Sequence, residues 1–320
     1  MLLDALFFLA GLVILYYGAE WLIYGASSIA LEYGIRPVIV GLTVVALGTS
    51  MPEFLVNAFA AWDGEPDLAI GNIIGSNISN IALILGCSAV VLPLTVTPQI
   101  LRKEYPMMLA AMVAFYGFAL DGTISQVDGM LLVTALIALL VYLYHDARTT
   151  SSSGIVEEIE GEVETGDPKS PLWKKVLHLT GGTLGLALGA KMMVDSSLSI
   201  AHEIGVPTAV VGLTIVAIGT SLPELAASMV GAIKSDADLS LGNVLGSNLL
   251  NVLFVVGTVS MMSPLDVDGT VIRIHFPIML GFCVLLLPLA WTGFRITRME
   301  GGVLLVGFMG YMAYLVAPLM

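Results

Sequence analysis

Two glutamates lie inside apolar stretches of the chain, each at the end of the same short motif. Glu53 is the last residue of GTSMPE, and Glu224 is the last residue of GTSLPE. A carboxylate at membrane depth is costly, so such residues are usually functional. Two facing carboxylates repel unless a cation lies between them, and Ca²⁺ accepts carboxylate and carbonyl oxygens in flexible geometry. The pair therefore predicts a cation site, and the alternative is a protonated glutamate hydrogen-bonded inside a helix bundle.

A second repeated motif adds neutral oxygen donors. It reads GNIIGSNISN from Gly71 and GNVLGSNLLN from Gly242. Residues four apart share one face of a helix. The faces predicted in this way are Asn72, Ser76 and Asn80; Asn243, Ser247 and Asn251; Thr49 with Glu53; and Thr220 with Glu224. Hydroxyl, amide and carboxylate oxygens suit Na⁺ and Ca²⁺, and the lack of His and Cys in both motifs argues against zinc or copper.

The prolines of the first motif predict interrupted helices. Proline removes a backbone donor and clashes with the carbonyl four residues back. Pro52 and Pro223 should therefore free carbonyls within Ala46 to Thr49 and within Ala217 to Thr220. Irregular backbone at membrane depth is tolerated where it is buried in protein or lines a cavity, so these carbonyls are further candidate ligands. The motif glycines are expected to allow close helix packing.

The two motifs belong to a longer internal repeat. Residues 41–86 align without a gap to residues 212–257 at a constant offset of 171, and 20 of the 46 aligned positions are identical. A purely structural duplication would select apolar and small residues, whereas polar residues are duplicated here. Inverted repeats with interrupted apolar segments at corresponding positions are typical of transporters with a site at the membrane midplane.

The composition places these repeats in a membrane. The 320 residues are 57% hydrophobic and 12% charged, with a mean hydropathy of +0.95, well above the roughly 45 to 50% apolar content of soluble domains. A spanning helix needs about 20 mainly apolar residues. Ten such runs are predicted, at 3–24, 37–62, 68–92, 105–120, 128–144, 174–200, 207–233, 239–262, 271–291 and 302–319.

The order of the runs predicts an all-α membrane protein with ten transmembrane helices in two inverted five-helix repeats. Residues 1–145 form the first repeat, 146–173 an acidic linker and 174–320 the second repeat. An odd number of helices per half makes the two halves enter the membrane from opposite sides. Ten of the twelve Lys and Arg residues fall on one side of such a topology. By the positive-inside rule, the linker is then cytoplasmic and both termini are extracellular.

Composition and motifs also exclude several functions. The net charge is −13 and no basic stripe is present to neutralise phosphates, which argues against nucleic acid as a partner. Neither H-E-x-x-H nor G-x-S-x-G occurs, so we do not expect an enzyme. Cys87 and Cys283 lie in apolar runs and imply no disulfide framework. The partners expected are the transported ions and the lipid bilayer, and no cofactor or obligate protein partner is implied.

The motif pairs GTSMPE with GNIIGSNISN and GTSLPE with GNVLGSNLLN closely resemble the two alpha repeats of the sodium/calcium exchangers, in the calcium/cation antiporter superfamily. The resemblance is closest to the short prokaryotic members and covers nearly the whole chain. It implies exchange of Na⁺ for Ca²⁺ by alternating access, with a central Ca²⁺ site between Glu53 and Glu224. Backbone oxygens near Thr49 and Thr220 would assist. The flanking Na⁺ sites implied by position draw on Ala46, Ser50 and Ser76, and on Ala217, Ser221 and Ser247.

One position departs from some members of that family. They carry an aspartate where this chain has Asn251, so Asn80 and Asn251 form a neutral pair and a third central carboxylate is absent. This weakens the case for K⁺ cotransport and for a proton carried at that position. The alternatives that the sequence leaves open are a H⁺-coupled Ca²⁺/cation antiporter that uses the same two glutamates, and a passive channel.

Overall fold

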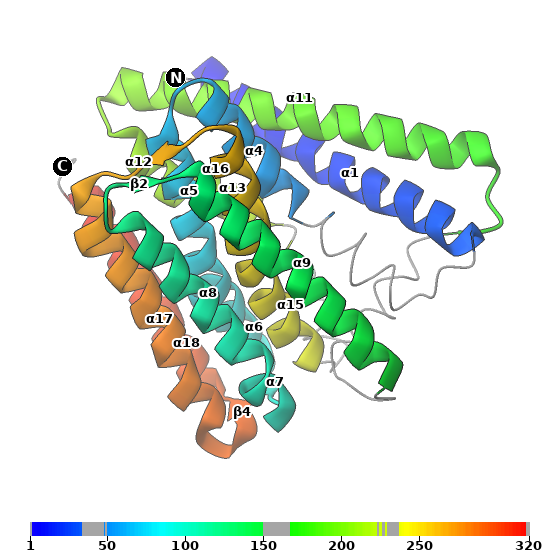
Figure 1. Cartoon of the computed structure of the whole chain (residues 1–320). Coiled ribbons are helices and arrows are strands. Elements are labelled where there is room, and N and C mark those ends of the chain that lie inside the picture. The colour runs from blue at the N-terminus through cyan, green and yellow to red at the C-terminus, as the bar shows by residue number, and fades with distance from the viewer. Residues whose placement is uncertain are drawn as a thin grey trace.

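A computed structural model describes residues 2–33, 48, 50–149, 167–222, 224, 225, 228 and 237–317 of the chain. Most of these residues are helical (Figure 1). Six helices among them are long and apolar enough to cross a membrane. They are Leu2–Ile29, Pro66–Val91, Leu172–Ile204, Leu241–Met262, Val271–Phe294 and Arg298–Val316. The chain is therefore an all-α membrane protein.

The other predicted runs are shorter in the described part of the chain or lie partly outside it. Helix α8 (Glu104–Ala119) has 16 residues, and the apolar part of α9 is Gln126–Tyr142. The runs predicted at 37–62 and 207–233 include residues that the structure does not describe. The count of ten transmembrane helices therefore stays a prediction.

Two long helices, α1 (Leu2–Glu32) and α11 (Leu172–Ile204), pack against each other along their length and are together called the arm (Figure 1). Glycine permits the close approach. A Cβ on Gly18 would lie 2.7 Å from the Leu186 nitrogen, and one on Gly189 would lie 2.7 Å from the Leu15 nitrogen. An ion pair of 2.7 Å between Nζ of the buried Lys175 and Oε2 of the half-exposed Glu32 joins the ends of the two helices.

The remaining helices form the bundle. They are α4 (Met51–Trp62), α5 (Pro66–Ser79), α6 (Leu85–Val91), α7 (Pro98–Arg102), α8, α9 (Gln126–Thr149), α12 (Thr208–Val211), α13 (Ala217–Thr220), α15 (Ala237–Leu250), α16 (Gly257–Met262), α17 (Phe276–Trp291) and α18 (Arg298–Val316). Helix α5 lies at its centre, where residues Leu68 to Ser79 are all buried. Burial on every side explains why its sequence is apolar or small except at the motif residues.

Local signals explain where several bundle helices begin. Gly64 has a φ of 80° and turns the chain after α4, and Pro66 opens α5 in the first turn, where its missing N–H is not needed. At α18, the Thr297 hydroxyl accepts a hydrogen bond from the Glu300 amide, and the Glu300 carboxylate accepts one from the Thr297 amide. This reciprocal cap satisfies two backbone donors at the helix end.

Several helices contain a wider, π-helical turn. The turn η2 (Asn80–Ile84) follows α5, and η4 (Asn251–Val256) follows α15. Each begins at the last asparagine of its GNxxGSNxxN motif. Two more are η3 (Gly212–Val216) and η5 (Val271–His275). Such turns are rare and are frequent at functional sites.

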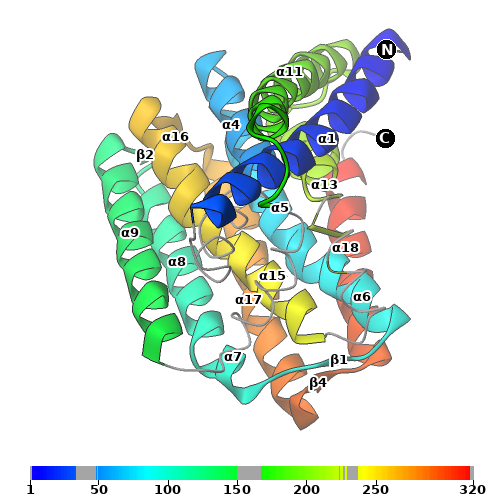
Figure 2. The same cartoon turned by 90° about the vertical axis from the view of Figure 1, so that its right-hand side faces the viewer.

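Four two-residue strands, which the sequence did not predict, pair the two halves of the chain. Strand β1 (Leu94–Thr95) is antiparallel to β4 (Arg295–Ile296), and β2 (Thr123–Ile124) is antiparallel to β3 (Leu265–Asp266). The two ribbons lie at opposite ends of the bundle (Figure 2). Each pairs backbone groups of interhelical connections that would otherwise lack partners.

Candidate ion-binding site

Helix α4 presents the first motif glutamate to the interior. Ser50, just before α4, has φ −86° and ψ 1°, outside the usual helical range, and Pro52 lies in the first turn of the helix. The interruption predicted from Pro52 is therefore present, at Ser50. Glu53 is 1% exposed, and neither of its carboxyl oxygens has a hydrogen-bond partner among the described residues. A buried polar group without a partner is costly, so this carboxyl requires compensation from another source.

The second motif copy repeats this local geometry. Helix α13 ends at Thr220, and Ser221 has φ −86° and ψ 5°, close to the values at Ser50. Glu224 is 3% exposed. The Glu53 and Glu224 carboxyl groups are near enough to repel each other, and the Thr220 hydroxyl is within reach of Glu53. The two predicted glutamates are thus both buried and within electrostatic reach of each other.

Helix α5 places its motif residues beside α13. The Asn72 amide oxygen accepts hydrogen bonds from the Thr220 hydroxyl at 3.3 Å and from the Ser76 hydroxyl at 3.5 Å. The Ser76 and Thr220 hydroxyl oxygens are 3.4 Å apart. All three residues are fully buried. Ser76 and Thr220, predicted from opposite halves of the chain, therefore lie in one hydroxyl and amide cluster.

Two further asparagines, which sequence reasoning did not select, hold the last motif residues. The Asn80 amide donates to the Asn248 side-chain oxygen at 3.0 Å, and the Asn251 amide lies 3.5 Å from the Asn77 side-chain oxygen. The two contacts are equivalent, because the repeat offset of 171 relates Asn80 to Asn251 and Asn77 to Asn248. Asn77 and Asn248 are identical in both copies. That identity was the available signal, but the four-residue spacing selected a different helical face.

Other buried oxygens in the same region also lack partners among the described residues. They are Ser50 Oγ, Asn57 Oδ1, Asn80 Oδ1 and Ser221 Oγ. Asn57 lies one turn after Glu53 on α4, and its amide donates to the Glu53 carbonyl at 2.7 Å. Sequence reasoning missed Asn57 because the second copy has serine at that position; a polar residue inside an apolar helix was the only signal.

Not every predicted ligand is placed as expected. The Ala217 carbonyl accepts hydrogen bonds from the Ser221 amide at 3.1 Å and from the Thr220 hydroxyl at 3.3 Å. The proline of the second motif therefore does not leave this particular carbonyl free, because the turn at Ser221 engages it. Ser247 is buried, at 4% exposure, on α15. Ala46, Thr49 and Pro223 lie outside the described residues.

The motif glycines were expected to allow close packing. A Cβ on Gly75 would lie 2.6 Å from the Ala217 Cβ and 2.7 Å from the Leu213 carbonyl, so close packing is present there. For Gly246, the equivalent residue, the corresponding neighbours would be Leu42 and Ala46, which lie outside the described residues. The expected close packing is therefore observed for the first copy.

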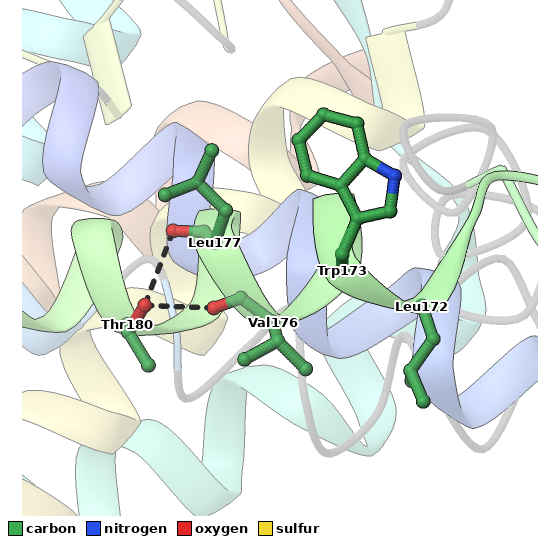
Figure 3. Close-up of a pocket in the computed structure, with 5 residues that line it drawn as sticks. All are labelled: Leu172, Trp173, Val176, Leu177 and Thr180. Carbon is green, nitrogen blue, oxygen red and sulfur yellow. Dashed lines mark hydrogen bonds between the residues drawn. The ribbon is translucent and has the colours of Figure 1, made fainter.

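The chemistry of this cluster suits hard cations. In the described part of the chain no group of three or more His, Cys, Asp or Glu residues is placed to hold a metal. Two carboxylates with hydroxyl and amide oxygens are left, a donor set typical of Na⁺ and Ca²⁺. A surface groove on the first turns of α11 has a different character (Figure 3). Its lining consists of Leu172, Trp173, Val176, Leu177 and Thr180, and includes none of the predicted site residues.

An all-α membrane protein with paired carboxylates buried among neutral oxygens has the features of a membrane transporter. The family model described as sodium/calcium exchanger protein matches residues 3–145 and 174–317. The chain therefore belongs to the sodium/calcium exchanger family, whose members are transporters and not enzymes.

Individual relatives agree with this assignment. The chain is 38% identical to a putative antiporter, CaxA, of Alkalimonas amylolytica, over 97% of this chain and 98% of that protein. It is 31% identical to the sodium/calcium exchanger MaX1 of Methanosarcina acetivorans, over 98% and 97%. Among solved structures it is similar to the sodium-calcium exchanger NCX_Mj, with 30% identity, a TM-score of 0.66 and 98% of each chain covered.

Proposed function

We propose that this chain exchanges Na⁺ for Ca²⁺ across the membrane by alternating access, with Ca²⁺ bound between Glu53 and Glu224. The observation that carries the proposal is the Glu53 carboxyl, which is buried, unpaired in the described structure and close to Glu224. Either one Ca²⁺ or several Na⁺ would neutralise the two carboxylates. An empty, doubly charged site resists closure because buried like charges repel strongly.

The flanking oxygens are proposed to hold Na⁺. In the second half these are the Ser221 hydroxyl and Ser247, and in the first half the Ser50 hydroxyl and Ser76. Ser50 Oγ and Ser221 Oγ support this because both are buried without a hydrogen-bond partner among the described residues. Ala46, proposed on sequence alone, completes the first set. Backbone oxygens near Thr49 and Thr220 are proposed to assist the central Ca²⁺ site. Asn80 and Asn251 supply neutral amide oxygens near the centre.

The proposed architecture is ten transmembrane helices in two inverted five-helix repeats, 1–145 and 174–320, with 146–173 as an acidic linker. Three observations support it. The family model matches 3–145 and 174–317 separately. The offset of 171 relates β1 to β3 and η2 to η4. The two ribbons, each joining the halves, lie at opposite ends of the bundle. The positive-inside rule then favours extracellular termini and a cytoplasmic linker.

Isotope flux tests the ion coupling. We expect purified protein in proteoliposomes to take up ⁴⁵Ca²⁺ when Na⁺ is loaded inside and replaced outside by choline, with an ionophore collapsing any pH gradient. The matched control replaces the Na⁺ gradient by a pH gradient of equal size. Uptake driven by the pH gradient and absent with Na⁺ would support a H⁺-coupled antiporter instead. Uptake with neither gradient would indicate a passive channel.

A further inference from the structure

An ion pair joins the arm to the helix that carries Glu53. Lys191 Nζ of α11 lies 2.6 Å from Asp63 Oδ2, and Asp63 directly follows α4. Helix α4 runs without interruption from Met51 to Trp62, and a helix of this length transmits displacement as a rigid element. Any sliding of α11 past α4 therefore changes the Lys191–Asp63 separation together with the position of Glu53 relative to the arm.

Lys191 has a second partner that does not depend on α4. Its Nζ lies 2.8 Å from Asp195 Oδ1, four residues later on the same helix. The Lys191 side chain is 40% exposed, and the Asp63 side chain is 26% exposed. Because Asp195 stays beside Lys191 wherever α11 moves, the lysine keeps a carboxylate partner when Asp63 is withdrawn. The contact with Asp63 is therefore easily reversible.

The internal repeat reproduces this charge pair with its signs reversed. The offset of 171 relates Lys191 to Glu20 and Asp63 to Lys234, and it also aligns Gly11 and Gly18 with Gly182 and Gly189 around the first of these positions. The equivalent pair thus also consists of one acid and one lysine, but the two have exchanged places. If the charges were unrelated, we would not expect both positions to change sign together. Here both positions change sign, and in one copy the two residues touch.

Glu20 has another contact in the present structure. Its carboxylate accepts a hydrogen bond of 2.9 Å from Tyr16 of its own helix. Lys234 lies outside the described residues. In a transporter of two inverted repeats, the halves exchange conformations when access changes sides. If one half forms a contact in the first access state, the equivalent residues of the other half are then expected to form it in the second access state.

We propose that the Lys191–Asp63 ion pair is a latch that stabilises one of the two access states, and that Glu20, which has the reversed charge at the position equivalent to Lys191, stabilises the other state. This inference rests on the proposed function, because it needs alternating access. It adds a role for charged residues outside the ion site: they set the balance between the two access states without binding the transported ions.

The test measures the apparent KM for Ca²⁺ separately at the two membrane faces. A shift in the access equilibrium raises the apparent affinity at one face and lowers it at the other. From the strength of exposed ion pairs, Asp63→Asn and Lys191→Gln should each change the ratio of the two KM values by about two- to fivefold, in the same direction. The double variant should change it no further, and Glu20→Gln should change it in the opposite direction.

Asp195→Asn is the matched control on the same helix. It removes the partner that Lys191 keeps in both states, so the released state loses stability relative to the latched one. We expect the KM ratio to move in the direction opposite to that of Asp63→Asn. A loss of fold alone would lower the amount of active protein and leave the ratio unchanged.

A reversible covalent bridge provides a second measurement. In a Cys87→Ala/Cys283→Ala background, Asp63→Cys with Lys191→Cys should lose exchange when a short bifunctional methanethiosulfonate bridges the two thiols, and should recover it on reduction. An unchanged KM ratio in the neutralised variants, or full exchange with the bridge formed, would overturn the latch if wild-type Na⁺-driven uptake is intact. Absence of that uptake in the wild type would instead overturn the proposed function.

Discussion

The two copies of the GNxxGSNxxN motif have the same residues in different surroundings. In the first copy, Gly75 is pressed against α13, and a Cβ there would lie 2.7 Å from the Leu213 carbonyl as well as against Ala217. For Gly246 in the second copy, the residues equivalent to these two neighbours are Leu42 and Ala46, which lie outside the described residues. The difference between the two copies lies in their amide contacts.

The amide groups of the two copies have different contacts. Asn243 donates to Ser228 of its own half at 3.2 Å. The Asn72 amide nitrogen, equivalent to that donor, has no partner among the described residues. On the proposed mechanism this asymmetry is expected, because inverted repeats hold different conformations at any moment and exchange them when access changes sides.

The largest effect is expected where the two copies should be equivalent. Glu53→Gln and Glu224→Gln each remove one of the two charges that balance Ca²⁺ in a buried site. Leaving a buried charge without its partner is worth about 3 kcal/mol or more, so Ca²⁺ affinity should fall at least about a hundredfold in each variant. Equilibrium ⁴⁵Ca²⁺ binding to detergent-solubilised protein measures this fall.

Asp121→Asn provides the control for charge removal. Asp121 is an exposed acid that accepts a hydrogen bond from the Thr123 amide in the turn before β2. It lies outside the site and should leave Ca²⁺ affinity unchanged. Wild-type affinity in either glutamate variant would contradict the site, and a large effect in only one would show that the two copies contribute unequally.

Much of the architecture was predictable because it depends on composition and repetition. Apolar runs of membrane length gave the helical membrane fold, and duplicated polar residues identified the interior cluster. Glu53, Ser76 and Thr220, which the motifs selected, are all buried, and the Ser76 and Thr220 hydroxyl oxygens are 3.4 Å apart. These residues are recognisable because a polar side chain conspicuously interrupts an apolar helix.

The rest depends on contacts between helices, which spacing along one helix does not determine. The four-residue rule selected Asn80 and Asn251 but not the partners that orient them, Asn77 and Asn248. The ribbons consist of two-residue strands, too short to show an alternating pattern. The different contacts of Asn72 and Asn243 were not predictable from the motif, since the motif residues are identical in the two copies.

The glycine comparison is expected to give the next largest effect. Gly75→Ala places a methyl group against Ala217 Cβ and the Leu213 carbonyl, and overpacking of this kind typically destabilises by about 1 to 3 kcal/mol. Gly310→Ala lies at an exposed position of α18 where a Cβ would meet no described atom within 4 Å, and should leave the thermal midpoint in detergent close to that of the wild type. Equal losses of thermal stability in the two variants would show that Gly75 is not tightly packed.

The smallest effect concerns the two amide contacts between copies. Asn80→Ala removes a 3.0 Å hydrogen bond and leaves the buried Asn248 oxygen without that donor, which should destabilise by about 1 to 2 kcal/mol. Asn251→Ala removes a contact of 3.5 Å, beyond the usual range for a strong N–H···O bond, so its thermal midpoint should fall by less than half as much. Ca²⁺ saturation should reduce the difference if the ion draws both amides into one symmetric arrangement. A difference that persists unchanged at saturating Ca²⁺ would place these amides outside the ion's coordination sphere, as structural links between the repeats.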